Sequence, residues 1–318
     1  MSAAPTDPLL ARRDWLVGAA GGLGLLASAR ASAQAAASPA KAARRQAPVA
    51  SATPSRPRVG LALGGGSARG FAHIGVLKSL DQAGIKPDVV TGTSAGALVG
   101  AFYAAGWSPW QIEELFLQVR ESDVADFSAA GKRGLLTGDA LAALVQARLK
   151  GAQIESFPIP FAAVATDLKT GEMQMLRSGP VADAVRASCS LPGIFVPKTI
   201  GGRELVDGGL VSPLPVEAAR RMGCDVVIAV DVTAPPQPGD LSGLYEVILQ
   251  SFDIMGRALS NQEALQADLL IRPETGAYSS SNFGVRRELI QAGYVAAQAR
   301  LADVRHRIAT STPAMRAR

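Results

Sequence analysis

The stretch 89–98, Val-Val-Thr-Gly-Thr-Ser-Ala-Gly-Ala-Leu, predicts a short apolar strand, a tight turn and the start of a helix. Its turn has the pattern Gly-x-Ser-x-Gly, with Gly92, Ser94 and Gly96 at the defining positions. A serine on such a turn is held clear of the backbone, and the glycines remove Cβ atoms that would clash there. The following helix would direct its N-terminal N–H groups towards developing negative charge. The pattern is typical of a nucleophile elbow, although five-residue motifs also recur by chance in ordinary loops.

A glycine-rich loop lies about 25 residues before this turn. Residues 59–63 are apolar and predict a buried strand, 64–70 (Gly-Gly-Gly-Ser-Ala-Arg-Gly) form the loop, and 71–80 have helical spacing. Such a unit presents backbone N–H groups to an anion. A dinucleotide site needs Gly-x-Gly-x-x-Gly, but Arg69 occupies the last position of that fingerprint, and the next strand leads to Ser94 instead of an acidic residue. The loop therefore favours an oxyanion site over a dinucleotide site.

Two further blocks complete a family pattern. Ala-Ser-Cys-Ser-Leu-Pro at 187–192 matches the block Ala-Ser-x-x-x-Pro, and Val-Asp-Gly-Gly at 206–209 matches the block Asp-Gly-Gly. With the glycine loop and the elbow, these blocks stand in an order that resembles the patatin-like phospholipase family over residues 58–235. The resemblance implies an enzyme that hydrolyses fatty-acyl esters of phospholipids or lysophospholipids, with Asp207 as a catalytic residue.

The base that would activate Ser94 is expected to be an aspartate. A serine hydroxyl is a poor nucleophile until a base takes its proton, and histidine usually does so. The chain has two histidines: His306 lies outside the matching blocks, and His73 falls in the first turns of a helix, where a packing role is expected. These observations favour a Ser94–Asp207 dyad. Because a solvated carboxyl has a pKa near 4, the site should shield Asp207 and hydrogen-bond it to Ser94.

The oxyanion that forms during ester cleavage needs backbone donors. We expect the N–H groups of Gly64, Gly65 and Gly66 to supply them, with Ala95 as a further donor. Arg69 is expected to steady the loop instead of contacting substrate. The remaining residues expected to support the motifs are Gly70, Gly92, Gly96, Gly208 and Gly209. An aspartate base requires no metal, and the chain shows no ligand cluster, so no metal or other cofactor is expected.

Strands and helices alternate through the chain, and no internal repeat is visible. This order predicts an α/β fold, a three-layer α/β/α sandwich around a mainly parallel central sheet, in one domain over residues 58–311. Further expected helices cover 109–120, 138–150, 181–188, 215–222, 244–265 and 285–308, and further strands 159–166, 173–176, 201–207, 224–232 and 268–271. Asp167 is expected to cap a turn between two of these strands.

Charge and cysteine content exclude several classes. Of the net charge of +5, residues 34–58 carry five basic side chains and no acid, so the body of the chain is close to neutral and nucleic acid is not an expected partner. Two cysteines, Cys189 and Cys224, exclude a disulfide scaffold and a cysteine-rich zinc site. They leave two alternatives, a pair of buried thiols or one disulfide in an oxidising compartment. Oligomeric state is not predicted.

The first 33 residues resemble a twin-arginine signal peptide. Arg12-Arg13 precedes a Gly-, Ala- and Leu-rich stretch that ends in small residues, and about 15 apolar residues are too few to span a membrane comfortably. This pattern predicts export, with a periplasmic destination; an uncleaved membrane tether is the alternative. Residues 34–57 predict a disordered basic linker able to touch anionic lipid, and 312–318 a C-terminal tail.

We therefore expect a serine acyl hydrolase whose partner is a lipid or another acyl-ester substrate at a membrane surface. Two alternatives remain at this stage. One is a related hydrolase of soluble short-chain esters or thioesters. The other is an envelope lipid-binding protein whose elbow is no longer catalytic.

Overall fold

The computed structural model of the chain describes residues 56–120, 123–124, 126–127, 133–236 and 242–313. The predicted signal peptide (1–33), nearly all of the predicted linker (34–57) and most of the predicted tail (312–318) lie outside these residues. Within the described ranges, no helix combines the length and the apolar character needed to cross a membrane.

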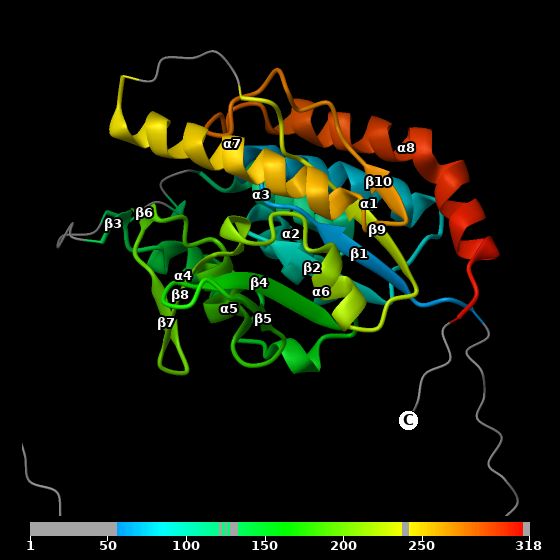
Figure 1. Ribbon diagram of the computed structural model, residues 1–318, viewed down its shortest axis with the longest axis horizontal. Helices are drawn as coiled ribbons and strands as arrows, with labels where there is room; N and C mark the ends of the chain where they lie inside the picture. Colours follow the sequence, from blue (N-terminus) through cyan, green and yellow to red (C-terminus); the bar gives the residue numbers. More distant parts are fainter. Residues whose placement is uncertain (1–55, 121–122, 125, 128–132, 237–241, 314–318) are drawn as a thin grey trace, which may run out of the picture. The chain divides into compact units, whose positions relative to one another are not determined.

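A mainly parallel sheet forms the centre of the described body (Figure 1). Its eight strands include the path β10-β9-β1-β2-β4-β8-β7, with β5 also paired to β4. The parallel strands are β1 (Val59–Leu63), β2 (Val89–Thr93), β4 (Phe161–Asp167), β9 (Val226–Val230) and β10 (Leu269–Ile271). The antiparallel strands are β5 (Met173–Leu176), β7 (Lys198–Ile200) and β8 (Arg203–Asp207). A separate parallel pair consists of β3 (Gly134–Leu136) and β6 (Gly193–Phe195).

Helices cover both faces of the sheet. The described helices are α1 (Ala72–Gln82), α2 (Ala95–Ala104), α3 (Pro109–Gln118), α4 (Asp139–Arg148), α5 (Val181–Ser188), α6 (Val216–Arg221), α7 (Leu244–Ala264) and α8 (Arg286–Thr310), with 3-10 helices η1 (Ser67–Phe71), η3 (Ile154–Ser156) and η4 (Gly208–Leu210). Because strand side chains alternate between faces, Leu61 packs in the core under α1, α2, α3 and α8, whereas Ala62 packs in a second core under α6. The predicted three-layer α/β fold is confirmed.

Three short strands were not predicted. β3, β6 and β7 have three residues each, which is too short for an alternating pattern to be recognised. The longer elements lie close to their expected positions, and Asp167 caps the predicted turn, its Oδ1 accepting the amides of Lys169 at 2.9 Å and Thr170 at 3.1 Å.

The site is positioned by two strands that meet end to end. β2 runs parallel to β4 and places Thr93 opposite Val164, whereas β8 runs antiparallel to β4 and places Asp207 opposite Ala165. Both lie on the edge of β4 away from β5, since β5 pairs with the same residues of β4 from the other side. The carboxyl end of β8 therefore meets the carboxyl end of β2, where the turn with Ser94 begins.

Candidate active site

Ser94 sits on a strained turn between β2 and α2. Its φ of 53° lies in the left-handed region, which costs a non-glycine residue of order 1–3 kcal/mol. The turn closes tightly: a Cβ added to Gly92 would lie 2.4 Å from Gly96 O, and one added to Gly96 would lie 2.1 Å from Leu63 O. Glycine is therefore required at both positions of the motif, as a nucleophile elbow demands.

Asp207 is buried at the end of β8, with 3% of its surface exposed. Its Oδ1 accepts the amide of Gly209 at 2.7 Å. Burial raises the pKa of Asp207 to about 6, although hydrogen bonds with the Ser94 side chain and the Gly209 amide act in the opposite direction. The structure thus brings the two predicted catalytic residues together. A carboxylate with such a pKa accepts a proton at neutral pH better than a solvated one does.

The block at 187–192 fixes the backbone of both Ser94 and Asp207 by hydrogen bonds. Ser188 Oγ accepts the amide of Ser94 at 2.9 Å and donates to a carbonyl of β4. Ser190 O accepts the amide of Asp207 at 2.9 Å, and the Ser190 hydroxyl is held in turn by the buried guanidinium of Arg186. The sequence pattern marks this block as a family motif but assigns no role to Ser188, Ser190 or Arg186.

The prediction that Gly64 and Gly65 donate to the oxyanion is wrong. The amide of Gly64 donates to Val230 O at 3.0 Å and that of Gly65 to Pro213 O at 2.8 Å, so both N–H groups are used in holding the loop. Among the described residues, the amides of Gly66 and Ala95 have no hydrogen-bond acceptor, and both residues line the cavity at Ser94. Of the four predicted oxyanion donors, the amides of Gly66 and Ala95 are therefore the two that remain available to a substrate.

Arg69 ties the glycine loop to helix α7. Its side chain, almost fully buried, forms an ion pair with Asp253 of α7. Asp253 also accepts a hydrogen bond from Ser280 Oγ at 3.1 Å, and Ser280 O accepts the amide of Ala68 at 3.0 Å. Next to Arg69, a Cβ on Gly70 would lie 2.4 Å from Ala95 Cβ, so the loop packs directly on the first turn of α2.

The loop after Asp207 connects strand β2 to helix α7. Thr93 Oγ1 donates to Ser212 O at 2.7 Å, and Glu263 of α7 accepts Ser212 Oγ at 2.5 Å and the Leu214 amide at 2.7 Å. Burial raises the pKa of Glu263 to about 7. Where this loop begins, a Cβ on Gly208 would lie 2.3 Å from a carbonyl oxygen of β4. Glu263 was not predicted, because 56 residues separate it from Asp207 and no motif marks it.

His73 has a structural position. It is fully buried, and its Nε2 lies 2.7 Å from Gly64 O, so it braces the glycine loop from behind. Burial lowers the pKa of His73 to about 4. In the part of the chain that the structure describes, neither His73 nor the exposed His306 lines the cavity at Ser94.

Cys189 lies in the cavity wall beside Ser94, and burial raises the pKa of its thiol. No disulfide joins Cys189 to Cys224. The described ranges contain no cluster of three or more His, Cys, Asp and Glu side chains able to hold a metal ion.

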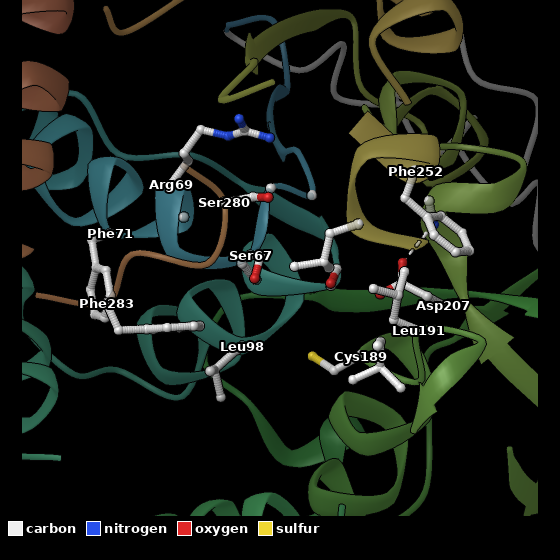
Figure 2. A pocket seen from close by; sticks show the side chains of 18 of the residues that line it. Ser67, Arg69, Phe71, Leu98, Cys189, Leu191, Asp207, Phe252, Ser280 and Phe283 are labelled. Atoms are coloured by element: carbon white, nitrogen blue, oxygen red, sulfur yellow. Dashed lines mark hydrogen bonds between the residues drawn. The ribbon is translucent and has the colours of Figure 1, made fainter. Parts of the chain in front are cut away.

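Ser94 and Asp207 open into an apolar cavity of about 340 Å³. Its lining includes Leu98, Phe116, Leu191, Phe195, Phe252 and Phe283. Figure 2 shows Phe71 and Phe283 at one end and Asp207 with Phe252 at the other. The cavity can hold an extended hydrocarbon chain with its polar end at Ser94.

The family model of the patatin-like phospholipases matches residues 61–220, about half of the chain. The chain belongs to this family. Among patatin-like phospholipase relatives, an uncharacterised NTE family protein of Mycobacterium tuberculosis is 38% identical over 185 residues, which cover 56% of this chain and 50% of the relative. Lysophospholipase nte1 of Emericella nidulans is 31% identical over 286 residues, covering 74% of this chain and 18% of the relative. The chain thus spans half or less of these relatives' length.

The fold of this chain is also found among solved structures. VipD of Legionella pneumophila aligns with a TM-score of 0.54 at 16% identity, over 79% of this chain and 67% of VipD. At this level of identity the likeness concerns the fold.

Proposed function

We propose that this patatin-like phospholipase is a serine acyl hydrolase with a Ser94–Asp207 dyad. The observation that carries the proposal is the end-to-end meeting of β2 and β8, which sets the elbow serine beside a buried aspartate whose pKa is raised to about 6. The absence of a cavity-lining histidine in the described residues supports aspartate as the base.

The reaction would proceed in two steps. Ser94 Oγ attacks the ester carbonyl as its proton passes to the Asp207 carboxylate, and the amides of Gly66 and Ala95 stabilise the oxyanion. The leaving alcohol takes the proton from Asp207 as the acyl-enzyme forms. Water then attacks the acyl-enzyme as Asp207 accepts its proton. The bond between the acyl carbon and Ser94 Oγ breaks, Oγ takes this proton from Asp207, and the free fatty acid is released.

The proposed substrates are fatty-acyl esters of phospholipids or lysophospholipids. The apolar cavity between Asp207 and the Phe71–Phe283 end would accept the acyl chain. The fungal relative bears the name lysophospholipase, which supports the lysophospholipid class.

A fluorophosphonate probe followed by a lipid panel tests this function. Labelling of the wild-type chain that disappears in Ser94→Ala, with fatty acid released from (lyso)phospholipids, is the expected result. Release from short-chain esters or thioesters alone would favour the soluble-ester alternative. A protein that binds lipid vesicles and is never labelled would be a non-catalytic lipid binder, and the proposal would fail.

We also propose that residues 1–33 direct export to the periplasm by the twin-arginine route, on the basis of Arg12-Arg13 and the apolar stretch that follows. Replacing both arginines with lysine should trap the precursor in the cytoplasm. Continued export of that variant would refute the proposal, and an exported protein of unchanged mass in the membrane fraction would indicate the tethered alternative.

A further inference from the structure

Helix α7 presents an apolar face to solvent. Leu244, Val247, Ile254, Met255 and, just after the helix, Leu265 are 45% to 81% exposed. At 100° per residue these side chains share one face with the exposed Ser251, Ala258 and Gln262. None of these side chains is charged. We call this set the outer face of α7.

The opposite face of α7 carries the charges. Asp253 pairs with Arg69, Arg257 donates to Thr233 O at 3.0 Å, and Glu263 accepts from the loop after Asp207. A helix on the surface of a water-soluble protein normally has the reverse polarity, with its apolar stripe towards the core. These contacts hold α7 in this rotation, so the apolar residues cannot turn inward without breaking an ion pair.

The same helix borders the cavity. Leu249, Phe252 and Gly256 on its inner side line the space at Ser94, and Phe252 lies at the Asp207 end in Figure 2. Only the thickness of one helix, roughly 10 Å, therefore separates the outer face from the cavity.

We propose that the outer face of α7 docks on the surface of a lipid bilayer. This inference rests on the proposed function, because a lipid substrate would then pass from the bilayer into the cavity alongside the docked helix. Interfacial helices insert an apolar face between headgroups and acyl chains without a complementary partner surface, and α7, at roughly 1.5 Å per residue over 21 residues, offers about 31 Å of such a face.

A second copy of the chain fits this face less well. Specific interfaces bury roughly 800 Å² per partner, whereas these five partly exposed apolar side chains supply on the order of 500 Å². The outer face of α7 therefore fits a bilayer surface better than a second copy of the chain.

The test measures binding of the full chain, as Ser94→Ala, to vesicles of phosphatidylcholine alone, because the basic segment 34–57 is expected to touch anionic lipid independently of α7. Adding Val247→Gln, Ile254→Gln and Met255→Gln should weaken co-sedimentation about tenfold or more. Val295→Gln on α8, where Val295 is 55% exposed, is the matched control and should bind like the parent. Unchanged binding of the triple variant, or no binding by the parent, would overturn the proposal.

Three further measurements separate the outcomes. With Ser94 restored, the triple variant should lose activity on vesicles and retain activity on a dispersed short-chain ester. An unchanged melting temperature shows that the triple variant folds. If the triple variant does not fold, Ile254→Gln alone is tested in its place. Sedimentation that changes from dimer to monomer in the variant would assign the face to a second copy and overturn the proposal. If the wild type hydrolyses no ester while the parent still binds vesicles through α7, the proposed function fails and the docking surface stands.

Discussion

The amide of Ser94 donates a hydrogen bond to Ser188 Oγ at 2.9 Å. The same hydroxyl donates to Val164 O on β4, the residue opposite the last residue of β2. Ser188 thus fixes the backbone of a residue whose φ of 53° is otherwise unfavourable.

Replacing Ser188 should disturb catalysis more than substrate binding. In Ser188→Ala the amide of Ser94 loses its buried acceptor, at a cost of about 1–3 kcal/mol in the free energy of unfolding. We expect kcat to fall at least about tenfold with little change in KM, because the nucleophile is misplaced by a fraction of an ångström. Ser156→Ala, which removes an exposed serine hydrogen bond, is the control. A normal kcat in Ser188→Ala would show that Ser94 needs no such support.

Asp207→Asn should abolish turnover and fluorophosphonate labelling, with kcat lower by about 10³-fold or more, because the amide cannot accept the Ser94 proton. Asp167→Asn is the matched control, since its amide oxygen can still cap the turn after β4. The converse variant, His73→Ala, should keep most of its kcat at 25 °C while losing about 2–3 kcal/mol of stability through the buried cavity it creates. Loss of turnover in His73→Ala with activity in Asp207→Asn would reverse the assignment of the base.

The pH profile should report Asp207. As the base it must be ionised, and its pKa is raised to about 6, so kcat/KM should rise with pH up to about 6 and level off above it. Stability linked to Asp207 has the opposite sign: the folded state favours the protonated form, so this contribution is lost as pH rises from about 3.8 to about 6. Initial rates on a dispersed ester from pH 4 to 8 measure the first effect. A profile whose midpoint stays near 4 would mean that Asp207 is solvated during catalysis.

Glu263 should make a second contribution to the pH dependence of folding. Its pKa is raised from 4.5 to about 7, so ionisation opposes folding and stability falls as pH rises through this window. Glu263→Gln can keep both hydrogen bonds to the loop, donating to Ser212 and accepting from Leu214, without titrating. The melting temperature of Glu263→Gln should therefore decline less between pH 4.5 and 7 than that of the wild type. Above pH 7 the free energy of unfolding of the variant should exceed that of the wild type by about 1–3 kcal/mol. Glu263→Ala should instead lower kcat, because the loop loses its anchor.

Much of the site could be predicted because its chemistry is local. The sharp turn at Ser94 needs glycines two residues to either side, and the Asp-Gly-Gly block marks the end of β8. The apolar runs of β1, β2 and β9 mark buried parallel strands. The oxyanion donors were only partly predicted, because an N–H group is available only if no other acceptor binds it. The acceptors for the amides of Gly64 and Gly65 lie on segments about 150 residues further along the chain.

The amino-acid sequence by itself determined the elbow, the glycine loop and the alternation of strands and helices, since each depends on residues close together in the chain. Only the tertiary structure decided which groups meet at Ser94. The opposite directions of β2 and β8 along one edge of β4 bring Asp207 to the nucleophile. The contacts of Asp253 and Glu263 turn the charged side of α7 towards the body of the protein and its apolar side chains towards solvent. Both results depend on contacts between residues that are far apart in the sequence, from 42 positions for Ala165 and Asp207 to 184 positions for Arg69 and Asp253, which no local pattern encodes.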